Sequence, residues 1–193
     1  MKDPTTVFDE ETDSGTPIMP GMYPANLVSL ITRAFDSGST VFNMRFKISD
    51  EVKDTSVPQQ VKSGGTFQEV RDGSGNPVEV SASFMSGKIF YADGVWFTPS
   101  PAKGEGWRNR RYKEVFENLG VSFPREENGS VSLGEIEESD VLGMPAIIKL
   151  SESKYTNKNG EEKTAFKAVE IHPWTDGKKL SEAEVASDDK IPF

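Results

Sequence analysis

Residues 42–48 read Phe42-Asn43-Met44-Arg45-Phe46-Lys47-Ile48, and this stretch decides the fold class. Apolar and polar residues alternate along it with a period of two. That is the pattern of a β-strand with one face in the core and the other in solvent. Because Arg45 and Lys47 lie on the polar side, we expect a sheet with a basic outer face at this strand.

The rest of the body also reads mostly as strands. The stretches expected to contribute strands are residues 22–33, 66–81, 88–98, 144–151 and 164–171. Turn signals separate or interrupt them at 36–39, 72–77, 93–94 and 157–160, the last containing the Asn-Gly pair suited to a hairpin. The polar residues 49–65 are expected to form a loop.

One helix is expected over 106–119. Apolar residues recur there at helical spacing, at Tyr112, Val115, Phe116 and Leu119, and Gly120 suits the position after a helix. A helix between the third and fourth strands of a small twisted sheet is the layout of an OB-fold, a five-stranded Greek-key barrel. We therefore expect an all-β body with one main helix: an OB-fold barrel with an extra hairpin.

Composition limits the chemistry. The chain has 193 residues, no cysteine and one histidine, His172. Disulfides and thiol chemistry are excluded, and a zinc site or catalytic pair based on histidine has little material. No run approaches the roughly 18 apolar residues of a membrane span, and residues 1–4 lack the apolar stretch of a secretory signal. We expect a soluble cytoplasmic protein with no membrane partner.

The formal net charge is −9, which taken alone argues against a polyanionic partner. The distribution is uneven, because residues 1–14 and 126–140 are acidic whereas residues 84–125 carry a positive excess. Local positive charge predicts phosphate binding of modest affinity and marked salt sensitivity. We expect three parts: a flexible acidic arm over 1–20, the body over 21–174 and a disordered tail over 175–193.

Aromatic and basic residues lie close together in the second half of the body. Trp96 and Phe97 end a strand, where one of the two side chains must point outward. The following loop and helix start add Lys103, Trp107, Arg108, Arg110 and Arg111. Single-stranded nucleic acid requires aromatic faces for its bases and cations for its phosphates. The alternative is a helix start with solvated arginines and a tryptophan that covers the core.

Two further surfaces fit the same purpose. One is the outer face of the second strand, with Arg45 and Lys47, which is the binding platform in OB-folds. The other is the tip of the last hairpin, with Lys154, Tyr155, Lys158 and Lys163. An ordinary solvated strand face and a solvated lysine-rich turn are the alternatives, so the prediction depends on all three surfaces together.

The last six residues, 188–193, read Asp-Asp-Lys-Ile-Pro-Phe. Phe193 can fill an apolar pocket, Pro192 stiffens the segment, and the aspartates can steer it toward a basic surface. This ending resembles the acidic tip of bacterial single-stranded DNA-binding proteins, typically Asp-Asp-Asp-Ile-Pro-Phe, from which Lys190 departs. The resemblance implies that Asp188, Asp189, Ile191, Pro192 and Phe193 bind replication, recombination or repair proteins. An incidental chain end is the alternative.

The element order of the body is similar to that of phage-encoded single-stranded DNA-binding proteins with an OB body. The similarity runs from 21–25 through the helix to 143–146 and the 154–163 hairpin. It implies a non-catalytic, sequence-independent role in phage DNA replication and recombination, without cofactor or metal, in the host cytoplasm. Two alternatives stay open: a phage structural or assembly protein with a β-barrel body, and a nuclease using Glu135, Glu137, Glu138 and Asp140.

Overall fold

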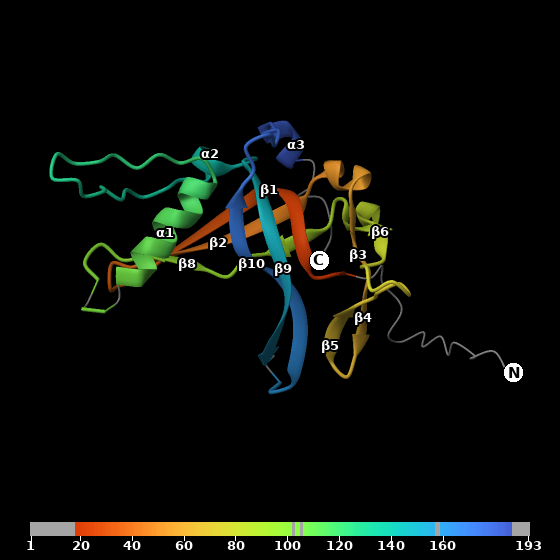
Figure 1. Cartoon of the computed structure of the whole chain (residues 1–193). Helices are drawn as coiled ribbons and strands as arrows, with labels where there is room; N and C mark the ends of the chain where they lie inside the picture. Colours follow the sequence, from red (N-terminus) through yellow and green to blue (C-terminus); the bar gives the residue numbers. More distant parts are fainter. Residues whose placement is uncertain (1–17, 102, 105, 157–158, 187–193) are drawn as a thin grey trace, which may run out of the picture.

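The computed structural model of this chain describes residues 18–101, 103–104, 106–156 and 159–186. A six-stranded sheet dominates it, with the strand order β10-β9-β1-β2-β7 and with β8 also paired to β2 (Figure 1). Its strands are β1 (Gly21–Ala34), β2 (Thr40–Ile48), β7 (Ile89–Tyr91), β8 (Val95–Phe97), β9 (Pro145–Thr156) and β10 (Glu162–Pro173). The body is therefore mostly β-structure with few helices, as predicted.

The two ends of this sheet meet. Ala92, directly after β7, forms a parallel bridge with Ala168 of β10, the strand at the opposite end of the order. β1 pairs antiparallel with both β2 and β9, so it lies at the middle of the sheet. The strands consequently form a closed ring around one apolar core.

The alternation predicted for β2 is confirmed. Phe42, Met44, Phe46 and Ile48 are buried, whereas Asn43 is exposed and Arg45 and Lys47 are partly exposed. The predicted helix is also present, as α1 (Gly106–Asn118). No helix within the described residues is long and apolar enough to cross a membrane.

Helix α1 packs on the core through aromatic rings. The ring of Tyr112 lies 5.3 Å from that of Phe42 and 5.1 Å from that of Phe97. The Tyr112 hydroxyl donates a hydrogen bond of 2.7 Å to the carbonyl of Gly134, and burial raises the pKa of this phenol well above its ordinary value. The inward side of β2 is thus closed off by α1, which leaves the other side of the strand as the surface available to a ligand.

Residues 49–65 are not simply a loop, so that expectation was wrong. They contain the 3-10 helix η1 (Asp50–Asp54), β3 (Ser56–Pro58) and β4 (Gln60–Ser63). β3 pairs with β6 (Glu79–Ser81), which leads into the 3-10 helix η2 (Ala82–Met85), and β4 pairs with β5 (Thr66–Glu69). Strands of three or four residues are too short to leave a readable period in the sequence.

Residues 174–186, which we call the C-terminal strap, pack against the body. The tail was expected to be disordered from residue 175, and for residues 175–186 this expectation was wrong. The side-chain amide of Asn26 donates hydrogen bonds to the carbonyls of Gly143 (3.0 Å) and Lys178 (2.8 Å). The strap ends in α3 (Glu182–Ala186), where Val185 is buried. Polar composition predicted disorder, but hydrogen bonds to the backbone hold this segment without many apolar residues.

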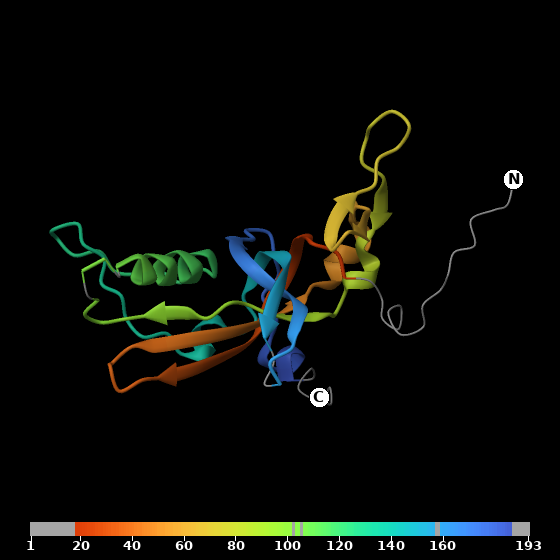
Figure 2. The ribbon, with the colours of Figure 1, turned by 90° about the horizontal axis from the view of Figure 1, so that it is seen from below.

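Gly143 permits the close approach of the strap. It follows the short helix α2 (Glu138–Val141), has a φ of +77°, and accepts a 3.0 Å hydrogen bond from the N–H of Leu180. A Cβ at this position would lie 2.2 Å from the carbonyl oxygen of Leu180, so only glycine fits. The strap thereby reaches the side of β1 and β2 opposite to α1 (Figure 2).

Candidate nucleic-acid interface

Strand register brings the outward side chains of β1, β2, β7 and β8 onto one surface. Arg45 is paired with Tyr91, while Val41 is paired with Arg33 on one side and with Trp96 on the other. Side chains that alternate with core residues point to the opposite face of the sheet. The arginine–aromatic face, as we name this surface and its rim, consists of Ile31, Arg33, Phe35, Asn43, Arg45, Lys47, Tyr91, Trp96, Trp107 and Arg108.

One half of the arginine–aromatic face is a continuous row of stacked groups. The rings of Phe35 and Trp96 are 5.1 Å apart and stacked, and the guanidinium carbon of Arg33 lies 4.9 Å from the Phe35 ring. The guanidinium carbon of Arg108 lies 5.7 Å from the Trp96 ring and 5.6 Å from the Trp107 ring. The row therefore connects the β1–β2 turn with the start of α1.

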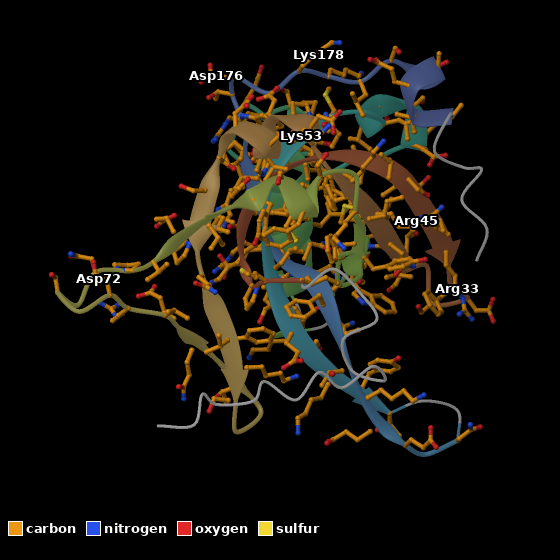
Figure 3. The ribbon with its side chains drawn as sticks, turned by 90° about the vertical axis from the view of Figure 1, so that its right-hand side faces the viewer. Arg33, Arg45, Lys53, Asp72, Asp176 and Lys178 are labelled. Carbon is orange, nitrogen blue, oxygen red and sulfur yellow. The ribbon has the colours of Figure 1, made fainter. Side chains whose placement is uncertain are left out.

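The other half is built on Arg45 and Tyr91. The guanidinium carbon of Arg45 lies 6.0 Å from the Tyr91 ring, and its Nε is buried without a hydrogen-bond partner in the described residues. A pocket of about 460 Å³ adjoins this arginine, lined on one side by Ile31 and on the other by Val185 of the strap. Figure 3 shows Arg33 and Arg45 on the same side of the molecule.

Two aromatic rings of this face are open to solvent. Tyr91 is 55% exposed and Trp107 is 58% exposed, whereas Trp96 is partly covered by its stacked neighbours. Exposed rings offer a flat surface on which a nucleobase can stack, and stacking is tolerant of base identity. Tyr91 and Trp107 are therefore the rings best placed to receive a base.

Two arginines of this face, Arg33 and Arg45, have no acidic partner among the described residues. Lys47 differs, because it lies near Asp50. A hydrogen bond from the Ser86 hydroxyl, with help from Lys53 and Lys47, holds the pKa of the Asp50 carboxyl below its ordinary value.

The hairpin of β9 and β10 has the opposite character. Its lysines contact carboxylates: Lys154 lies 3.1 Å from Glu162, and Lys163 lies 3.6 Å from Glu161. Tyr155 is 47% exposed, but neutralised lysines surround it. The sequence predicted this tip as a third binding surface, and Lys158, which belongs to it, lies outside the described residues.

The remaining predicted site residues do not belong to the arginine–aromatic face. Lys103 is exposed in the loop before α1, and Arg110 is exposed on α1; within the described residues neither forms a hydrogen bond, ion pair or ring contact with the arginine–aromatic face. Arg111 instead points to β10, where it donates a 3.4 Å hydrogen bond to the carbonyl of Val169 and lines a pocket of about 210 Å³ with His172. Arg45, Lys47, Trp96, Trp107 and Arg108 are the predicted residues that the structure brings together.

Arg33, Phe35 and Tyr91 were missing from the predicted site. Arg33 closes the apolar run of the first strand, and Phe35 follows the strand immediately, so neither stands in a basic or aromatic cluster in the sequence. A register count could have found Arg33 and Tyr91, because both occupy positions opposite outward residues of β2. Phe35 lies in the β1–β2 turn, which no strand register specifies.

Two of the acidic residues proposed for a nuclease, Glu138 and Asp140, have structural partners. Glu138 accepts a 2.9 Å hydrogen bond from the N–H of Leu30, and Asp140 accepts one of 2.9 Å from the N–H of Glu137. In the part of the chain that the structure describes, no three His, Cys, Asp or Glu side chains converge to hold a metal ion. Glu138 thus links α2 to β1, and Asp140 holds the start of α2.

Comparison with known proteins adds no assignment: no protein-family model matches this chain, and no curated protein matches it either.

Proposed function

We propose that this protein binds single-stranded DNA without sequence preference and that its body is an OB-fold. The strand connections support the fold assignment. β1 pairs with β2 and with β9, α1 lies in the chain between β8 and β9, and the Ala92–Ala168 bridge links the third and last strands of the ring. OB-folds, which are Greek-key barrels with this order of strands, bind oligonucleotides on their second and third strands.

One observation carries the functional proposal. In the part of this acidic chain that the structure describes, Arg33 and Arg45 have no carboxylate partner, and both lie against aromatic rings on one surface. Guanidinium groups that are pre-oriented by rings bind phosphate through several donors and can stack on bases. Unpaired bases would lie on Tyr91 and Trp107, and the adjacent phosphates would contact the arginines.

The net charge of −9 sets the expected strength of binding. Long-range attraction to DNA is weak because acidic residues surround the basic patch, so affinity depends on short-range contacts. Each phosphate contact to a single strand contributes about 0.7 to the slope of log affinity against log salt. A small patch therefore predicts a shallow slope and a preference for unpaired over duplex DNA.

Titration of the full chain with labelled oligo-dT and with duplex DNA tests this proposal. We expect quenching of tryptophan fluorescence, weaker binding at high salt, and an affinity for duplex at least about tenfold lower, since base faces are hidden there. Trp107→Phe should remove most of the quenching. Trp174→Phe is the matched control, because Trp174 lies at the start of the strap against Gly177.

Other outcomes separate the alternative functions. An absence of binding at low salt would contradict the proposal and favour a structural or assembly role. Degradation of the oligonucleotide after addition of Mg²⁺ would favour a nuclease. Equal affinity for single strand and duplex would remove the base-stacking part of the proposal.

We further propose, on the resemblance of residues 188–193, that this segment binds proteins of phage DNA replication, recombination or repair. These residues lie outside the described part of the chain. Removal of residues 187–193 leaves the strap in place and takes away two aspartates that follow Val185, which lies beside Arg45, so DNA affinity should be kept or rise by less than about threefold. Binding to a purified host repair or recombination protein should be lost. Retained binding would contradict a role for the segment.

A further inference from the structure

The centre of the arginine–aromatic face contains an asparagine beside a glycine. Asn43 is paired with Ile31 of β1 on one side. On its other side lies Gly94, in the connection between β7 and β8. A Cβ added to Gly94 would lie 3.2 Å from the side-chain oxygen of Asn43 and 2.8 Å from a methyl carbon of Val41. The side chains of Val41 and Asn43 therefore lie directly against the backbone of Gly94, and only a glycine leaves room for them there.

The donors and acceptor of the Asn43 amide are not paired with other groups of the described residues. Asn43 is exposed, and in the described part of the chain its side chain makes no hydrogen bond. An amide carries one acceptor and two donors, and these remain available to a ligand. The amide lies two residues from Arg45, which is paired with Tyr91, and two residues from Val41, which is paired with Trp96.

We propose that Asn43 hydrogen-bonds to the edge of one nucleobase that lies on this face between Tyr91 and Trp96. This inference rests on the proposed function and names the contact that would recognise the base. A carboxamide presents an acceptor and a donor side by side, and it can rotate by a half turn. It can thus match the paired donors and acceptors at the edge of any base. Asn43 then adds affinity without selecting a sequence.

Replacement of the amide by a carboxylate tests this contact. Asn43→Asp presents acceptors only, which suit the amino group of cytosine but oppose the carbonyl oxygens of thymine. Measured against the unmodified protein, binding of oligo-dT should weaken about tenfold more than binding of oligo-dC, the size expected for one mismatched hydrogen-bonding group. Asn43→Ala should weaken both oligonucleotides by similar factors.

A matched control separates base recognition from charge. Gln68→Glu makes the same amide-to-carboxylate change on β5, where the exposed side chain lies away from the arginine–aromatic face. It should leave the ratio of oligo-dT to oligo-dC affinity unchanged. Thermal melting should show that both variants fold, because both positions are exposed.

The results distinguish this inference from the function on which it depends. If the unmodified protein binds neither oligonucleotide, the proposed function fails, and the inference fails with it. If the unmodified protein binds both, and Asn43→Asp weakens oligo-dT and oligo-dC by the same factor, the function stands and the Asn43 contact is wrong.

Discussion

The arginine–aromatic face and the β9–β10 hairpin both display cations and exposed rings, yet they use them differently. On the face, Arg33 and Arg45 lie against Phe35 and Tyr91. On the hairpin, lysines lie against carboxylates, as in the pair of Lys149 and Glu170 at 2.5 Å. Counting positive residues therefore does not distinguish the two surfaces. What matters is whether a cation is already neutralised by a neighbour.

The physical basis of the contrast is the choice of side chain. Arginine is weakly hydrated and planar, so it can stack on a ring and still present donors at its edge. Lysine is a strongly hydrated point charge, and an exposed lysine–carboxylate pair contributes only about 0–1 kcal/mol to stability. The hairpin pairs thus do little for the fold, but they cancel the local charge that would attract DNA.

Reversing the charges of two arginines on the arginine–aromatic face should have the largest effect on DNA affinity. Arg33→Glu combined with Arg45→Glu should weaken binding to oligo-dT on the order of a hundredfold or more, because two phosphate contacts are replaced by repulsion. Lys154→Glu combined with Lys163→Glu changes the net charge equally but should cost less than about tenfold. Fluorescence anisotropy at low salt measures both. Equal losses would mean that only the overall charge matters.

Two exposed tyrosines provide a smaller test of the same contrast. Tyr91→Ala should weaken binding by about 5- to 100-fold, since one stacked base contributes about 1–3 kcal/mol. Tyr155→Ala on the hairpin should change the affinity less than about twofold. Anisotropy titration together with thermal melting checks that neither change acts through folding. A larger loss for Tyr155→Ala would reverse our assignment of the two surfaces.

The smallest expected effect is a gain. Glu161→Gln combined with Glu162→Gln should release Lys163 and Lys154 from their partners and strengthen binding to oligo-dT about two- to threefold at low salt, in keeping with the weakness of exposed pairs. The gain should vanish at high salt. Glu126→Gln combined with Glu127→Gln, in the acidic stretch outside the hairpin, is the control for net charge. An equal gain in that control would assign the effect to general electrostatics.

Much of the fold could be predicted from local pattern. Period-two alternation predicted β2, helical spacing predicted α1, and the Asn-Gly turn predicted the β9–β10 hairpin. The strap could not be predicted this way, because it is held by a hydrogen bond from Asn26 to a carbonyl 152 residues away in sequence. The packing of a polar segment depends on a partner that its own composition does not reveal.

The candidate site was predictable only in part, for a related reason. Trp96, Trp107 and Arg108 stand close together in sequence, so their grouping was visible. The stacking of Phe35 on Trp96 joins the β1–β2 turn to β8, which is distant in sequence, and only the pairing of β8 with β2 brings the two rings together. The contact between Asn43 and Gly94 could not be predicted from the sequence, because it depends on how the connection between β7 and β8 lies beside β2.

Val185 of the strap lies beside Arg45, where both line one pocket. The last seven residues of the chain follow Ala186 directly after this point. Seven residues reach at most about 25 Å when fully extended. A protein that bound Phe193 would consequently stay within about that distance of any single-stranded DNA bound beside Arg45. The partner would then reach DNA on the arginine–aromatic face without first having to diffuse to it.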